Sequence, residues 1–108
     1  MLAGAWPLVS LQSAGEAAQA VPGSASYELT FAAGRASTRA DCNVCGGALA
    51  VRGDTVTIGP IMACTRAACS TAGFEQAYVT VLAGDSTARI EGSELTLTSP
   101  RGVLRFRR

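Results

Sequence analysis

Alternating apolar and polar positions predict the first strands of this chain. The segment 27–31, Tyr-Glu-Leu-Thr-Phe, alternates strictly, which is typical of a strand with one buried face. An earlier strand is predicted around Pro7, which requires an edge or a bulge, and Trp6 and Leu8 point from it toward the core. The segment 13–26 is rich in Ala, Gly and Ser without periodicity, so we expect a loop there.

A β-hairpin is predicted where two alternating runs, residues 48–52 and 55–58, flank the dipeptide Gly53-Asp54. Glycine in the first position suits the type II′ turn of a two-residue hairpin. Further short strands are expected at residues 35–40, 88–90, 95–97 and 103–106. The last part of the chain is therefore expected to form an antiparallel meander.

Apolar residues recur at helical spacing in one segment, at Phe74, Ala77, Tyr78, Val81 and Leu82. This periodicity predicts an amphipathic helix over residues 71–83. Ser70 or Thr71 is placed to cap its N-terminus, Glu75 suits its first turns, and Gly84 can end it in a left-handed conformation. Together these elements favour a mainly β fold, an antiparallel, partly open barrel-like sheet with the helix packed on it.

Size and charge narrow the class of protein. A chain of 108 residues is expected to form a single domain, residues 1–108, with one small core. Only 16% of the residues are charged and the net charge is +1, so nucleic acid is not an expected partner. No run is long and apolar enough to span a bilayer, and residues 1–10 lack the basic and apolar regions of a signal peptide. We expect a monomer.

The chain has four cysteines, Cys42, Cys45, Cys64 and Cys69. They allow three disulfide pairings, and cross-strand partners in a hairpin have residue numbers with a constant sum. In the nested pairing Cys42 bonds to Cys69 and Cys45 to Cys64. The residue numbers of both pairs then add up to more than those of cross-strand partners in the predicted hairpin. A bulge or a loop near Gly59-Pro60 would absorb that offset, whereas the crossed pairing needs slippage in both directions. The nested pairing is therefore favoured.

Two other interpretations of the cysteines stay open. The spacings Cys-x2-Cys and Cys-x4-Cys could supply four thiolates to a structural zinc. The segment Cys42-Asn43-Val44-Cys45 could be a redox dithiol, which requires a thiolate stabilised by a helix N-terminus or a cation. It runs instead into Gly46-Gly47, where a turn or bulge is expected, so we predict no redox site. Because the second cysteine spacing is x4 and not x2, we do not predict a metal site either.

Catalytic machinery is not expected. The chain has no histidine and no lysine, which excludes a Ser-His-Asp triad, a Cys-His pair and Schiff-base chemistry. Carboxylates stand at Glu28, Asp41, Asp54, Glu75, Asp85, Glu91 and Glu94, with no spacing that forces two into one site. A glycine-rich phosphate loop is also lacking. We therefore predict no enzyme, no catalytic residue and no cofactor.

Several short motifs occur together in a fixed order: Trp-Pro-Leu-Val from Trp6, the strand at 27–31, Cys42-Asn43, and Thr-Arg-Ala-Ala-Cys from Thr65. This series resembles the META domain family of HslJ-like heat-shock lipoproteins over nearly the whole chain. The sequence departs from the family pattern at Asp41 and Thr38, where glycine is usual, and in having two additional cysteines, Cys45 and Cys64.

The resemblance has several implications. It supports the bridge between Cys42 and Cys69, whereas the bridge between Cys45 and Cys64 depends on register alone. Asn43, Thr65 and Arg66 become candidates for a functional surface, although turn hydrogen bonding also explains them. The family further implies a small β-barrel-like fold, a cell-envelope location, an N-terminus lipidated upstream of Met1, and a link to stress or antibiotic tolerance without an established reaction.

The function expected from the sequence is that of a non-catalytic, disulfide-stapled domain in the periplasm or outside the cell. It would act through protein or envelope contacts and meet the membrane only through an upstream lipid anchor. Two alternatives remain. One is a carrier of a small hydrophobic ligand, with interior space left by Ala36, Ala48, Ala50 and Ala63. The other is a zinc-stabilised cytosolic domain.

Overall fold

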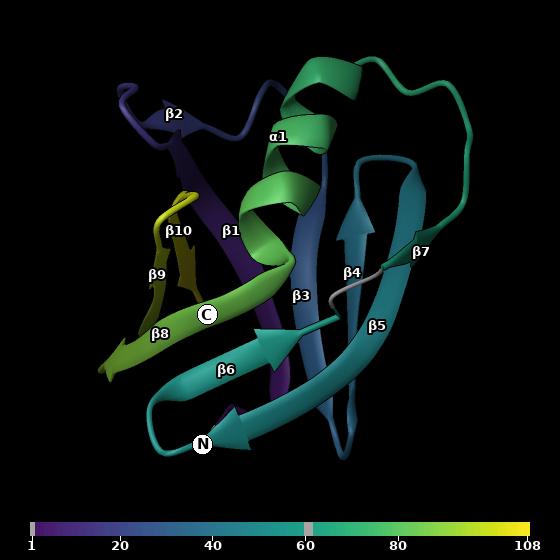
Figure 1. The fold of residues 1–108 in the computed structure, drawn as a ribbon. Helices are drawn as coiled ribbons and strands as arrows, with labels where there is room; N and C mark the ends of the chain where they lie inside the picture. The colour runs from purple at the N-terminus through teal and green to yellow at the C-terminus, as the bar shows by residue number, and fades with distance from the viewer. Residues whose placement is uncertain (1, 60–61) are drawn as a thin grey trace.

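Antiparallel strands make up most of this computed structural model, which describes residues 2–59 and 62–108 (Figure 1). The strands are β1 (Gly4–Ser13), β2 (Gln19–Ala20), β3 (Tyr27–Ala32), β4 (Arg35–Ala40), β5 (Asn43–Arg52), β6 (Thr55–Ile58), β7 (Ala63–Cys64), β8 (Gly84–Glu91), β9 (Glu94–Ser99) and β10 (Gly102–Arg107). The helix is α1 (Ala72–Leu82). Met1 lies outside the described residues. Pro60, where the bulge or loop near Gly59-Pro60 is predicted, also lies outside them.

The sheet closes into a barrel. Its strands follow the order β10-β9-β8-β6-β5-β4-β3-β1, and β1 pairs again with β10. The short strands β2 and β7 add to β1 and β5. The mainly β class with one packed helix is confirmed, and the ring is more complete than the pattern predicts. The reason is the length of β1, which pairs with β3 through its first half and with β10 through its second half, across a register shift between Leu8 and Ser10.

The barrel interior is filled by apolar side chains. Trp6, Leu29 and Phe106 are 0% exposed and belong to one packed cluster. Helix α1 lies across one opening of the barrel (Figure 1) and adds four buried residues to it: Phe74, Tyr78, Val81 and Leu82. The predicted apolar face of the helix is therefore the face that covers the core.

Helix α1 lacks a basic residue in its last turn, and Arg101 supplies the cation from the β9–β10 turn. The guanidinium donates hydrogen bonds from Nε to the Val81 carbonyl at 3.3 Å and from Nη2 to the Asp85 carbonyl at 2.8 Å. Gly84 follows the helix with a φ of +100°, as predicted, and Arg101 lies against its Cα. The Val81 carbonyl lies in the last turn of α1, where helix carbonyls carry partial negative charge, so Arg101 satisfies that carbonyl and offsets the charge, and its bond to Asp85 joins the helix end to β8.

Replacing Arg101 with Ala is expected to lower the free energy of unfolding by about 1–2 kcal/mol, because it removes both hydrogen bonds and the cation. Arg105→Ala, at an exposed position of β10, is the matched control and should cost less than about 0.5 kcal/mol. Urea unfolding followed by circular dichroism measures both. Equal losses in the two variants would show that Arg101 contributes nothing at the helix end.

A buried hydroxyl network joins α1 to the barrel. The hydroxyl of Thr38 donates to the Glu28 carbonyl at 2.8 Å and lies 2.7 Å from the Tyr78 hydroxyl. Tyr27 packs edge-on against Tyr78, with ring centroids 5.3 Å apart. Burial raises the pKa of both tyrosines above the ordinary value of 10.0, because the phenolate would lose its hydration.

These pKa shifts predict a loss of stability in alkali. An unfolded tyrosine ionises near pH 10, so the stability associated with Tyr27 and Tyr78 is complete below that pH and declines as the pH rises above it. Ultraviolet titration should place tyrosinate formation in the native protein at a higher pH than in urea. Tyr78→Phe should remove most of the difference. A native titration centred near pH 10 for both rings would contradict this prediction.

Candidate functional site

Asn43 is the centre of a polar cluster at the start of β5. Its side chain is 2% exposed and uses both ends of its amide. Nδ2 donates to the Ala67 carbonyl at 3.0 Å and to the two carboxylate oxygens of Glu75 at 3.2 and 3.0 Å. Oδ1 accepts from the Thr65 hydroxyl at 2.9 Å and from the Ala67 N–H at 2.8 Å. One buried side chain thus holds the 65–67 segment and α1 against the barrel.

The two disulfides flank Asn43. The structure pairs Cys42 with Cys69 and Cys45 with Cys64, which is the nested arrangement. In the β5–β7 pair Cys64 lies directly opposite Cys45. If the β5–β6 register continued unchanged, the residue opposite Cys45 would be the one two positions before Cys64. The offset on which the register argument depends therefore falls between β6 and β7.

The disulfide pairing also bears on the two alternative interpretations of the cysteines, the redox dithiol and the structural zinc site. Cys42 and Cys45 belong to different bridges, so they do not form a Cys-x2-Cys dithiol pair. Within residues 2–59 and 62–108, every cysteine is oxidised, and no cluster of His, Cys, Asp or Glu could hold a metal ion. Thiolates for a structural zinc are therefore not present in the described part of the chain.

Gly46 and Gly47 do not form the turn or bulge that their sequence suggests. Both lie inside β5, where they pair with Ser37 and Ala36 of β4. A Cβ on Gly46 would collide with the guanidinium of Arg35, which lies over it. A side chain at Gly46 would therefore displace the flexible, exposed side chain of Arg35, and the extended backbone itself does not demand glycine.

Asp41 caps α1 from a distant turn. Its carboxylate accepts from the Thr71 N–H at 3.1 Å and from the Thr71 hydroxyl at 2.6 Å. Thr71, one of the two residues expected to cap the helix, is the N-cap residue, but its side chain makes no capping hydrogen bond. Asp41 has a φ of +59°, a conformation that Asp tolerates better than most residues.

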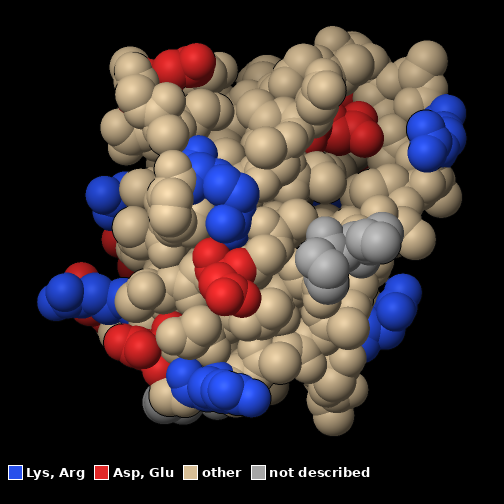
Figure 2. Space-filling model, viewed as in Figure 1, with Lys and Arg blue, Asp and Glu red and all other residues tan. Residues whose placement is uncertain are grey.

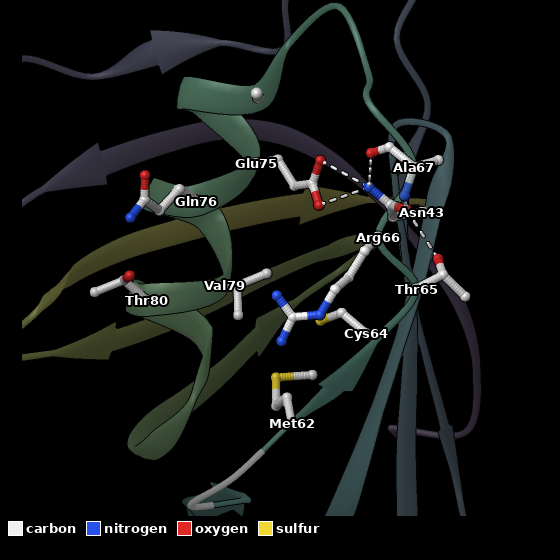
Figure 3. Close-up of a pocket in the computed structure, with 11 residues that line it drawn as sticks. Asn43, Met62, Cys64, Thr65, Arg66, Ala67, Glu75, Gln76, Val79 and Thr80 are labelled. Carbon is white, nitrogen blue, oxygen red and sulfur yellow. Dashed lines mark hydrogen bonds between the residues drawn. The ribbon is translucent and has the colours of Figure 1, made fainter.

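A groove of about 450 Å³ separates α1 from the segment 62–67 (Figure 3). Its lining residues are Asn43, Met62, Cys64, Thr65, Arg66, Ala67, Ala72, Glu75, Gln76, Val79 and Thr80. Figure 3 shows the Arg66 guanidinium between Val79 and Met62, whereas the Glu75 carboxylate points at Asn43. Arg66 makes no hydrogen bond or ion pair within the described residues. The groove therefore pairs a cation open to a ligand with a carboxylate already engaged.

The charge of this face is mixed. Acidic and basic side chains are interspersed over the side that carries α1, without a large area of one sign (Figure 2). Such a surface does not favour a polyanion, which agrees with the small net charge.

The interior space expected from small residues does not form as predicted. Ala48, Ala50 and Ala63 are exposed on the outside of the barrel, and Ala36 is enclosed in the packed core. An apolar hollow of about 490 Å³ does occur at the β5–β6 end, where Leu2, Val56 and Ile90 are among its lining residues. It opens at the surface of a barrel whose centre is filled, so the structure gives no support to an enclosed carrier cavity.

The structure brings together the three candidate residues Asn43, Thr65 and Arg66. Sequence reasoning missed Glu75 as their partner, since it is expected there only to favour the first turn of the helix. It also missed the backbone groups of Ala67, which no side-chain pattern marks. An Asn directly after a cysteine is the signal that could have pointed to a buried amide held beside a bridge.

The fold and the two bridges define a small β-barrel domain stabilised by disulfides. A family model described as META domain matches residues 1–108, and the chain belongs to the META domain family. The two disulfides indicate an oxidising, non-cytosolic compartment. Among residues 2–59 and 62–108, no helix has the length and apolar character needed to cross a membrane.

Solved structures are similar to this chain. An NMR structure of a protein from Burkholderia xenovorans is 26% identical, with a TM-score of 0.78, and the match covers 99% of this chain and 83% of that one. A second NMR structure is 17% identical, with a TM-score of 0.74, over 99% of this chain and 90% of the other, and it shows the fold alone. At the level of curated proteins, no match to this chain is found.

Proposed function

We propose that this META domain is a non-catalytic binding module of the cell envelope, located in the periplasm or outside the cell, which acts through contacts with other proteins. The observation that carries the proposal is the construction of one groove wall. Two disulfides and the hydrogen bonds of Asn43 hold the segment 64–69 in place. A surface ordered before binding loses less entropy when a partner arrives.

The chemistry of the groove supports binding over catalysis. Glu75 is the one carboxylate among the lining residues, and both of its oxygens accept hydrogen bonds from Asn43. General acid-base catalysis needs a group that is free to exchange a proton with a substrate. Arg66 offers a charge for recognition, but an arginine does not deprotonate at neutral pH.

The family resemblance supplies the physiological setting of this proposal. Contacts made in the envelope would serve stress or antibiotic tolerance, and a lipid anchor upstream of residue 1 would keep the domain at the membrane surface. The partner is a protein exposed in the same compartment.

Photo-crosslinking in living cells tests the proposal. A photoreactive residue at Gln76 or Thr80, both exposed in the groove, is expected to give a discrete adduct of higher mass. The same probe at Arg52, exposed in the β5–β6 hairpin, is the control and should give none. Adducts of equal yield at all three positions, or none at the groove, would contradict a binding role for this face.

A further inference from the structure

One wall of the groove is a strand with a free edge. Within the described residues, β7 pairs only with β5. The Thr65 N–H donates to the Val44 carbonyl at 3.0 Å, so Thr65 directs its backbone groups toward β5. Backbone groups alternate along an antiparallel strand, and the N–H and C=O of Cys64 therefore point away from β5. Cys64 lines the groove, so this donor and acceptor lie at its border.

The other wall is the face of α1 that carries Gln76, Val79 and Thr80. Val79 is half-buried and provides an apolar contact, while Gln76 and Thr80 are exposed polar groups. A strand edge opposite a helix face forms a slot in which an extended chain can bind, with main-chain hydrogen bonds on one side and side-chain contacts on the other.

The charge in the slot selects among extended chains. Arg66 is the one cation among the lining residues, and within the described residues it has no ion-pair partner. Its planar guanidinium matches the two oxygens of a carboxylate. Glu75 accepts from Asn43 and forms no ion pair with Arg66 within the described residues.

We propose that this groove binds an extended peptide segment whose backbone pairs with the edge of β7 at Cys64 and whose carboxylate pairs with Arg66. This inference rests on the proposed function and deepens it by naming the chemistry of the partner. The carboxylate belongs either to an Asp or Glu side chain or to a C-terminus, since the guanidinium recognises the same group in both.

A random octapeptide library displayed with free C-termini is the probe. Selection on the purified, oxidised protein should enrich acidic peptides or a defined C-terminal sequence. The enriched peptide is then synthesised in three forms: unchanged, with a C-terminal amide, and with Asp or Glu replaced by Asn or Gln. The form that fails to bind identifies which carboxylate meets Arg66.

Chemical-shift titration locates and measures the binding. Shifts are expected at the amides of residues 62–67 and 75–80. Arg66→Gln should weaken binding about tenfold, because it removes the cation and keeps a polar side chain of similar reach. Gln76→Glu places a carboxylate in the same groove and should weaken binding by a similar factor. Arg52→Gln, the matched loss of an exposed arginine outside the groove, should change affinity less than about twofold.

Both groove variants change exposed positions, so unchanged thermal unfolding is the folding control. No enriched peptide, equal binding by Arg66→Gln, or shifts confined to another face would overturn the peptide inference. A groove adduct in cells together with any of these results leaves the proposed function standing. If the peptide binds in solution but no groove adduct forms in cells, the peptide site exists and the proposed cellular function is contradicted.

Discussion

Asn43→Asp is expected to lower the free energy of unfolding by about 3–5 kcal/mol at neutral pH. The wild-type amide donates to the Ala67 carbonyl and to both oxygens of Glu75. An Asp side chain of the same shape donates nothing and places a second carboxylate against Glu75 in a position that is 2% exposed. Desolvation and like-charge repulsion then act together.

A second substitution should recover much of this loss. In Asn43→Asp/Glu75→Gln, the amide lies on the helix and the carboxylate on the strand, so the hydrogen bond between the two positions is restored with its direction reversed. The single change Glu75→Gln is the matched control. A double-mutant cycle from urea unfolding gives the coupling energy, which we expect to favour the double variant by about 1–3 kcal/mol.

The Asn43→Asp variant should also become more stable as the pH falls from 7 toward about 4–5, because one of the two carboxyl groups then takes up a proton and donates to the other. Asn43→Ala lacks the second charge and should show no comparable gain. A variant that is equally unstable at both pH values would show that repulsion is not the cause of its instability.

Reduction of both disulfides is expected to destabilise the domain by about 5 kcal/mol, a large part of the stability of a small protein. The bridges span sequence separations of 27 and 19 residues, each worth about 3 kcal/mol alone through the entropy of the unfolded chain. Because the loops are nested, closing one shortens the other, and their sum is smaller than twice that value.

The two bridges are expected to differ in their response to a reductant. Cys42 is exposed, whereas Cys45 is 1% exposed, so the bridge between Cys42 and Cys69 should be reduced first. Thermal unfolding of the variants Cys42→Ser/Cys69→Ser and Cys45→Ala/Cys64→Ala separates their contributions. Equal melting temperatures for the oxidised protein and both variants would show that the bridges do not stabilise the fold.

Local patterns predicted much of the barrel. Strict alternation at residues 27–31 marked β3, and Gly53-Asp54 marked the β5–β6 hairpin, because both signals depend on neighbours in the chain. The nested cysteine pairing could also be derived, since register in a hairpin is an arithmetic property. Helical spacing placed α1 within one residue of its bounds at each end.

Contacts between distant segments could not be predicted. Gly46 suggests a turn in sequence, but in the fold it pairs with Ser37 inside β5, beneath the guanidinium of Arg35. The carboxylate that binds the N-cap residue of α1 belongs to Asp41, thirty positions before Thr71. The partner of Asn43 is Glu75, and no sequence pattern around either residue indicates that the two are in contact. In each case a tertiary contact decides the role of the residue, and tertiary contacts follow from the completed fold.

The pairing of β1 with β10 determines when this protein can fold. The ring closes only after residues 102–107 have emerged from the ribosome, and contacts this distant in sequence form slowly. Until then β1 lacks β10, the partner of its second half, and the barrel stays open. Both bridged loops, 42–69 and 45–64, end before β8 begins, so the paired cysteines can come within reach of each other before the last strand closes the ring.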